Sequence, residues 1–522
     1  MKKISIYLLS CLLFASIISC GSPEDKKQEF FKKGQTYFEQ KDYVKASLEL
    51  RNAVQIDSEF ADAYLLLGKV ELENRNFEKA YGFLSKAVKS APENIDARVN
   101  LAKLLIGGRG FDQAMEQAEE ILTLEPDNID GLMIKASVYM SKKEYEQAKK
   151  ILTGLKSKGL STPDIFLMLA SIADTKGNKE DAYSITKEGL NKNADSIALI
   201  LMSAQREAEK KNDNKAEELL KQTIQLEPDN DGFKMNLAGF YLNRSRYEDA
   251  VKVIDQIITA SPSSEQKRVV TAAFWLKNNR VDQAVKVLED GIALKPESVE
   301  LRKRLSEIYI AAREYQKAEN ILSQGVALHK DTKSPDWINL QTSLAEILFQ
   351  KQDIPGTKKI IDDVLKNDPK NVAGQMIRGN ILLAEKNFGE AVASFRIVVN
   401  DHPELIDAHI ALSRAHALNK EYELALDVLK NALKREPDSD NLLKAMAEFH
   451  LMREDIDAAR KIMEDRVKKY PDNQNAKSDM QKFTAVLVSY YFSKGMVDKA
   501  ESICRENPKN TDACIALGSM YE

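Results

Sequence analysis

The sequence has few of the residues that carry chemistry in enzymes or cross-links in small secreted domains. Its 522 residues include only four cysteines, five histidines and two tryptophans. The motifs Gly-x-Ser-x-Gly, His-Glu-x-x-His and Cys-x-x-Cys and the phosphate-binding P-loop are all absent. No insertion reaches the length of about 50 residues that a compact catalytic domain needs. We therefore predict no enzyme activity, no cofactor and no metal site.

A concentrated positive charge is missing as well. The chain carries 76 lysines and arginines against 80 acidic residues, and the two signs are interspersed along it. Proteins that bind nucleic acid gather basic residues on one face or stripe, so we do not expect nucleic acid as a partner. Apart from the N-terminal segment, no apolar run is long enough to cross a bilayer. The charged residues, 30% of the total, are typical of the solvated faces of helices.

What the sequence has instead is a repeat. Alanine recurs every 34 residues from Ala46 to Ala318, at position 20 of a unit whose first copy begins at Lys27. After a shift of five residues Thr357 takes this position, and the series resumes at Ala391. Small residues recur at position 8 in the same way. A stack of similar helix pairs buries an equivalent small residue in every unit, whereas a single globular core does not.

The best copy of the repeat runs from residue 61 to residue 94. Its characteristic residues are Tyr64, Leu67, Gly68, Ala80, Leu84, Ala87 and Pro92. This pattern resembles the tetratricopeptide repeat (TPR), which pairs two antiparallel helices in 34 residues. The resemblance covers nearly the whole chain. It implies an all-α solenoid, a right-handed superhelix of about 14 helix-turn-helix repeats followed by one terminal helix.

Departures from the repeat suggest the boundaries of the parts. We expect a signal peptide at 1–19, a short membrane tether at 20–26, and repeats one to nine at 27–330. An insertion at 331–337, read as a bend, precedes repeats ten to thirteen at 338–473. Residues 474–522 hold an irregular repeat fourteen, with a short second helix, and a terminal half-repeat. The last segment either caps the stack imperfectly or continues into a longer protein.

The N-terminal residues indicate that the protein is targeted to the cell envelope. Lys2 and Lys3 precede an apolar run from residue 4 to residue 18, which ends in Ser19-Cys20-Gly21. This segment resembles the lipobox of bacterial lipoproteins, in which the cysteine receives the lipid. The alternative is an ordinary secretory signal with an incidental cysteine. By the resemblance, glycine rather than aspartate after Cys20 implies the outer membrane, with the repeats facing the periplasm.

A candidate binding groove follows from the resemblance. In TPR proteins the first helix of each repeat, helix A, lines the concave face with positions 2, 5, 9, 12 and 13. Position 5 is apolar in eight successive repeats before Lys303 ends the series: Phe31, Leu65, Val99, Met133, Leu167, Leu201, Met235 and Val269. Such a stripe suits an extended peptide or a partner helix, but it could equally pack between neighbouring A helices. Aspartates at position 2 either edge this groove or simply favour the helix start.

The remaining polar candidates have structural explanations. His409 and His416 share a helix face but lie about 10 Å apart along its axis, so we expect them to fill the core rather than to bind one metal ion. Cys504 and Cys514 flank the last turn of the chain. They either form a disulfide, which an oxidising periplasm would allow, or serve as two small buried apolar residues.

The layout as a whole points to a functional class. A long TPR lipoprotein resembles those of exopolysaccharide export and the associated PEP-CTERM system. This implies a membrane-anchored scaffold that binds proteins in its groove and assembles an export machine. The alternatives are a pilus or outer-membrane protein assembly factor, or the N-terminal part of a longer regulator or enzyme.

Overall fold

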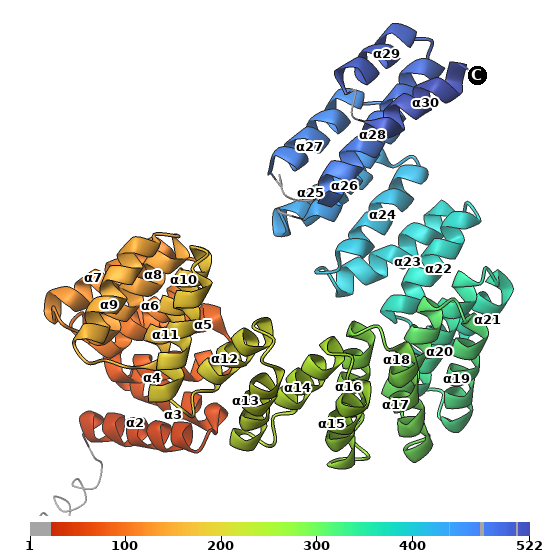
Figure 1. The fold of residues 1–522 in the computed structure, drawn as a ribbon. Coiled ribbons are helices and arrows are strands. Elements are labelled where there is room, and N and C mark those ends of the chain that lie inside the picture. Colours follow the sequence, from red (N-terminus) through yellow and green to blue (C-terminus); the bar gives the residue numbers. More distant parts are fainter. Residues whose placement is uncertain (1–21, 438, 470–473, 508–509, 522) are drawn as a thin grey trace, which may run out of the picture. The chain divides into compact units, whose positions relative to one another are not determined.

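The computed structural model describes residues 22–437, 439–469, 474–507 and 510–521, and these ranges contain 29 α-helices and no strand (Figure 1). The predicted all-α solenoid of fourteen helix pairs and a terminal helix is therefore confirmed. Even-numbered helices from α2 to α28 are the A helices of repeats one to fourteen, and the odd-numbered ones are the B helices. The predicted signal peptide at 1–19 and the predicted lipidation site Cys20 lie outside the described residues. No helix within these ranges is long and apolar enough to cross a membrane.

The chain forms two compact units, of which the first ends at Val253 and the second begins at Ile254. The first unit contains α2 Pro23–Glu39, α3 Tyr43–Ile56, α4 Ala61–Glu73, α5 Phe77–Ser90, α6 Ile95–Gly107, α7 Phe111–Leu124, α8 Ile129–Ser141, α9 Tyr145–Ser157, α10 Pro163–Thr175, α11 Lys179–Lys192, α12 Ile197–Glu209, α13 Asp213–Leu226 and α14 Asp231–Asn243. Helix α15 Tyr247–Thr259 contains the boundary. The second unit contains α16 Glu265–Lys277, α17 Val281–Leu294, α18 Val299–Ala311, α19 Tyr315–Leu328, α20 Pro335–Gln350, α21 Ile354–Asn367, α22 Val372–Ala384, α23 Phe388–Asp401, α24 Ile406–Leu418, α25 Tyr422–Arg435, α26 Asp440–Met452, α27 Ile456–Lys469, α28 Gln474–Ser493, α29 Val497–Glu506 and α30 Thr511–Tyr521.

The ends of the helices follow from local residue chemistry. Asn128 and Asn230 are the N-caps of α8 and α14, where their side-chain oxygens accept backbone N–H bonds from Gly131 (3.0 Å) and Gly232 (3.1 Å). An asparagine at this position satisfies one of the amides that a helix start leaves free. Many B helices end shortly before a proline, as α13 does before Pro228. Proline cannot continue a helix, so it fixes the end of the repeat where it occurs.

The turn from helix A to helix B has the same backbone conformation in every repeat. The residue at position 15 is left-handed in all fourteen turns, with φ between 57° and 78°. Only Gly177 and Gly495 are glycines there; the others include Lys41, Lys211 and Glu454. A side chain in this conformation is strained, which costs roughly 1–2 kcal/mol per residue. The short connection between two antiparallel helices imposes the conformation whatever residue stands there.

Position 8 is small because helix B lies directly against it. A Cβ atom built on Gly68 would lie 2.6 Å from the Leu84 side chain at position 24, and one on Gly379 would lie 2.5 Å from Phe395. Where alanine occupies position 8, as Ala102 does, it is fully buried. The prediction that position 8 lets two helices approach closely is confirmed.

Three A helices begin before the first position of the 34-residue unit. Helix α2 begins at Pro23, not Lys27, because Ser22 and Asp25 form a capping box in which each side chain accepts a backbone N–H bond from the other residue. Four residues assigned to the tether are therefore helical. The insertion at 331–337 contributes the start of α20 at Pro335, and α20 packs against both α18 and α19. Helix α28 extends to 20 residues.

A polar cluster joins neighbouring repeats in the first unit. Glu217 on α13 accepts hydrogen bonds from Lys221 (2.6 Å), Tyr241 (2.9 Å) and Arg246. Burial alone would raise the pKa of Glu217, but these hydrogen bonds outweigh it and lower the pKa to about 2. Glu217 is thus held as a carboxylate that ties repeat six to repeat seven.

Candidate functional site

In the first unit the A helices of the first two repeats line a cavity of about 320 Å³. Its walls come from the repeat positions that the sequence assigns to the groove: Phe31 and Leu65 at position 5, Gln35 and Lys69 at position 9, Asp62 and Asp96 at position 2, and Phe38 and Glu39 at positions 12 and 13. Helices α2 and α4 contribute nearly all of them. The expected groove positions therefore share one concavity at this end of the unit.

The eight apolar side chains at position 5 are more buried than side chains that project freely into an open groove would be. Leu65 and Val99 are only 8% and 6% exposed, and the other six are partly buried. Phe31 packs its ring 4.9 Å from that of Phe60 between centroids. The two explanations of the stripe are thus compatible for Phe31 and Leu65, which pack against neighbours and also border the cavity. Val269 belongs to the second unit.

Charged pairs connect successive A helices, and the first of them, Lys69 with Asp96, borders the cavity. The Lys69 ammonium lies 2.7 Å from the Asp96 carboxylate, and the Lys103 ammonium lies 3.7 Å from Asp130. In both cases position 9 of one repeat pairs with position 2 of the next. Of the aspartates at position 2, Asp62 and Asp96 border the cavity, and each also stands in the first turn of its helix. Exposed pairs of this kind contribute little to stability, about 0–1 kcal/mol each.

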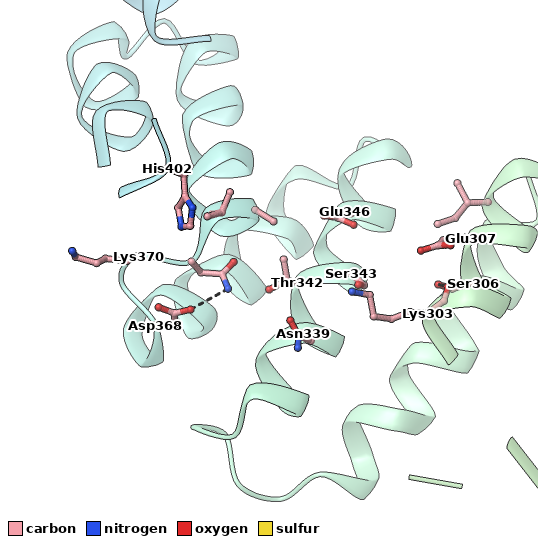
Figure 2. A pocket seen from close by; sticks show the side chains of 14 residues that line it. Lys303, Ser306, Glu307, Asn339, Thr342, Ser343, Glu346, Asp368, Lys370 and His402 are labelled. Carbon is pink, nitrogen blue, oxygen red and sulfur yellow. Dashed lines mark hydrogen bonds between the residues drawn. The ribbon is translucent and has the colours of Figure 1, made fainter. Parts of the chain in front are cut away.

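The second unit has a larger and more polar cavity of about 600 Å³ on its A helices (Figure 2). Helix α18 supplies Lys303 and Glu307, and helix α20 supplies Asn339, Thr342, Ser343 and Glu346. Figure 2 shows Lys303 extending from α18 toward α20, with His402 and Lys370 on the opposite side. The residues from α18 and α20 again occupy positions 2, 5 and 9, or adjoin them. Sequence reasoning took Lys303 as the end of the groove, but the structure places it at the start of this polar cavity.

One acid in this cavity, Glu346, has a pKa that its surroundings shift. Its side chain reaches solvent within the cavity yet has protein on several sides, and the resulting desolvation raises its pKa. The Lys303 ammonium lowers the pKa and the Glu307 carboxylate raises it, with a net shift upward. A cationic group entering between the two carboxylates would favour the charged form of Glu346. The signal for this site in the sequence is the change at position 5 from apolar residues to Lys303 and then Thr342, together with Glu307 and Glu346 at position 9.

An apolar cavity of about 530 Å³ adjoins the polar one. It lies between α16, α17 and α18 and is bordered by Val269, Ala273, Leu276, Val281, Ile308 and Ala311. Glu307 borders both cavities, so they meet at this residue. Within the second unit, the A-helix surface thus changes from apolar to polar over two repeats.

The histidines and cysteines that the sequence singled out have clear positions. His409 and His416 are buried, as expected for core residues, and bond to the Pro403 carbonyl (3.0 Å) and the Glu421 carboxylate (2.6 Å). Among the described residues no group of three or more His, Cys, Asp or Glu could hold a metal ion. Cys504 is buried, Cys514 is exposed, and both have free thiols. Burial, and to a smaller degree the neighbouring Cys514, raises the pKa of the Cys504 thiol.

Comparison with known families agrees with the repeat geometry. Residues 24–160 match the TPR domain of cytochrome c-type biogenesis protein H. Residues 209–272, 276–344 and 417–483 match a general tetratricopeptide-repeat model, so the matches together cover more than half of the chain. The chain is a tetratricopeptide-repeat protein. Proteins built from TPRs are typically non-catalytic and bind other proteins, which agrees with the absence of enzyme motifs from the sequence.

Solved TPR structures resemble this TPR protein at low sequence identity. The Naa15/Naa10 complex bound to HypK-THB is 14% identical, with 92% of this chain and 80% of that chain covered and a TM-score of 0.44. Yeast Tom70 is 15% identical, with coverages of 88% and 96% and a TM-score of 0.33. The Pseudomonas aeruginosa pilF protein is 20% identical, with coverages of 41% and 97% and a TM-score of 0.32. No curated protein matches the sequence.

Proposed function

We propose that this TPR protein is a lipid-anchored scaffold of the bacterial cell envelope that binds protein partners along its A helices. The observation that carries the proposal is the repeated use of positions 2, 5 and 9 to form cavities, at α2 and α4 in one unit and at α18 and α20 in the other. Equivalent positions on successive repeats offer a row of contacts, which suits an extended segment of a partner. The scaffold acts in the assembly of a cell-envelope export system, with exopolysaccharide secretion as the first candidate.

The second unit indicates what such a segment contains. The apolar cavity takes an aliphatic or aromatic side chain, and the polar cavity takes a cationic one between Glu307 and Glu346. Neighbouring A helices lie about 8–10 Å apart. An extended chain advances about 3.3 Å per residue, so anchors that are one A-helix spacing apart fall roughly two to three residues apart.

Capture of partners from membrane extracts tests this surface. Leu276 is 38% exposed at the apolar cavity and Glu346 is exposed at the polar one, so Leu276→Glu and Glu346→Lys disturb binding without burying a new charge. We expect each to reduce capture strongly. Leu294→Glu is the matched control, because Leu294 is 61% exposed on B helix α17. If the two A-helix variants keep their helical circular dichroism and still capture their partners, the proposed surface is wrong.

The lipid anchor is tested separately. Cys20 follows a charged and apolar leader of lipoprotein type, and Gly21 favours the outer membrane with the repeats in the periplasm. A fatty-acid analogue should label the wild-type protein and leave Cys20→Ala unlabelled. Equal labelling of both, or of neither, would remove the anchor from the proposal and leave the binding surface unaffected.

The match of residues 24–160 favours a second candidate function, a role in cytochrome c-type biogenesis. A deletion strain separates the two candidates. Loss of exported polysaccharide with normal covalently bound haem supports the first, and loss of haem-stained c-type cytochromes supports the second. Loss of pili or of outer-membrane proteins instead would redirect the role to those assembly systems.

A further inference from the structure

One junction in the first unit breaks the apolar pattern of the core at three places. Thr186 stands at position 24 of repeat five, and Ser203 and Arg206 stand at positions 7 and 10 of repeat six. All three side chains are buried. The same positions in the flanking repeats hold large buried apolar residues: Leu152 and Leu220 at position 24, Leu169 and Leu237 at position 7, and Ile172 and Phe240 at position 10.

The three polar residues line one cavity of about 330 Å³ between α11, α12 and α13. The Arg206 guanidinium is fixed within it, because Nε donates to Thr186 Oγ1 (2.8 Å) and the two Nη atoms donate to the Asp174 carboxylate (3.0 and 2.7 Å). Thr186 in turn donates to the Ala182 carbonyl (2.8 Å). Arginine has five N–H groups, so two remain beyond those used by these bonds.

Ser203 differs from its polar neighbours, because its buried hydroxyl has no hydrogen-bond partner. The residue is 8% exposed and borders the cavity. A buried polar atom without a partner is unfavourable, and native proteins rarely retain one without a reason. Leucine at this position would avoid the penalty, as it does in both flanking repeats.

The charges around the cavity favour an anion. Lys187 on α11, Arg206 on α12 and Lys215 on α13 border the cavity. Arg206 is paired with Asp174 (2.7 Å) and Lys215 with Glu218 (2.6 Å), so the rim charge that is left to an incoming anion is that of Lys187. The single acid that borders it, Glu207, accepts hydrogen bonds from the Tyr183 hydroxyl (2.9 Å) and from an asparagine amide (2.8 Å).

We propose that this cavity binds a small organic molecule through its carboxylate. Ser203 donates its hydroxyl hydrogen to the carboxylate, Arg206 supplies a remaining N–H group, and Lys187 adds positive charge at the rim. Leu190 and Leu219 provide apolar contact for the body of the ligand. The volume lies at the lower end of the range for small-molecule sites, about 300–1,000 Å³. The site lies apart from the proposed partner surface on the A helices, and its test is independent of that proposal.

Matched probes and variants test the site in the full chain purified in detergent. The probes are two acids with neutral counterparts that contain no carboxylate, D-glucuronate with D-glucose and succinate with succinamide. We expect at least one acid to raise the thermal unfolding midpoint with increasing concentration, and neither neutral compound to do so. Ser203→Leu restores the residue of the flanking repeats and should weaken binding about tenfold or more, since a hydrogen bond to a charged group is lost.

Two further variants keep the test decisive. Thr271→Leu is the control, because Thr271 occupies position 7 of repeat eight in the second unit and is also a buried hydroxyl without a partner. It should leave the response to the acids unchanged. Lys187→Gln changes an exposed rim residue, so it should fold even if Ser203→Leu does not, and it should weaken binding in a salt-dependent way. If neither acid shifts the midpoint, or if Ser203→Leu or Lys187→Gln responds as the wild type does, the proposal is overturned.

Discussion

The close contact at position 8 leads to a prediction with a built-in control. Gly68 on α4 and Gly82 on α5 belong to the same repeat, and both are helical. A Cβ atom on Gly68 would lie 2.6 Å from the Leu84 side chain, whereas one on Gly82 would meet nothing within 4 Å. Gly68→Ala and Gly82→Ala therefore make the same chemical change in two different surroundings.

The difference between the two variants isolates the contact. Alanine is favoured over glycine inside a helix by about 1 kcal/mol, and both variants gain this. Forcing a methyl group into a packed core costs about 1–3 kcal/mol, and only Gly68→Ala meets that cost. We expect Gly82→Ala to stabilise repeat two by about 1 kcal/mol, and Gly68→Ala to leave it about 1–3 kcal/mol less stable than Gly82→Ala. Native-state hydrogen exchange at the amides of α4 and α5 measures the local opening free energy directly.

Repeat three indicates how the strain can be relieved. It combines Ala102 at position 8 with Ala118 at position 24, and both are fully buried. Leu84→Ala alone should destabilise repeat two by about 2–5 kcal/mol, because it leaves a cavity. In that background Gly68→Ala should lose its penalty, giving a favourable coupling of about 1 kcal/mol or more. If Gly68→Ala stabilises the repeat as much as Gly82→Ala does, the contact does not explain the small residue at position 8.

Three further predictions concern turns, pH and thiols. Lys211→Gly should raise local stability by about 1 kcal/mol, because residue 211 has φ 63°, and Gly177→Ala should lower it. Hydrogen exchange at the flanking helices measures both changes, and a change in the same direction for the two variants would contradict the strain argument. The folded-state pKa of Glu217 is lowered to about 2, so its stabilisation is present above the ordinary carboxyl pKa near 4.5 and is lost as the pH falls toward 2. Glu217→Gln should therefore reduce stability by about 1–3 kcal/mol at pH 7 and much less at pH 2, as denaturant titrations at the two pH values would measure. If Cys504 and Cys514 pair in the periplasm, mass spectrometry of the protein isolated without reductant should find both protected from alkylation, and free reaction of both would exclude the disulfide.

Much of the fold could be predicted because one packing arrangement recurs in every repeat. The 34-residue alanine series indicated the number of helices, and the short second helix of repeat fourteen, α29, was also predicted. The turn at position 15 was not, since most of its residues are neither glycine nor asparagine and the conformation is imposed by the helices on either side. The start of α2 was missed because the capping box of Ser22 and Asp25 lies outside the 34-residue pattern.

The candidate sites were harder to predict, because they depend on residues that depart from the repeat. The apolar stripe at position 5 could be predicted from the sequence, since apolar residues that recur at one repeat position form an obvious series. The sequence offered no reason to connect Lys303 with Glu346, which lie 43 positions apart in the chain and come together only through the stacking of α18 and α20. The five-residue insertion hides this relation, because it shifts the repeat positions of everything that follows.

A departure from the repeat is evidence for a site only when the fold leaves it unsatisfied. Thr357 replaces the alanine of position 20 and is fully buried, but its hydroxyl donates to the Asp353 carbonyl (2.7 Å) within its own helix turn. That substitution needs no ligand to explain it. Ser203 is nearly as buried, has no partner, and borders a cavity that is also lined by two further exceptions to the pattern, Thr186 and Arg206. In a repeat protein the neighbouring repeats supply the reference for each position, so the second kind of exception can be recognised within a single chain.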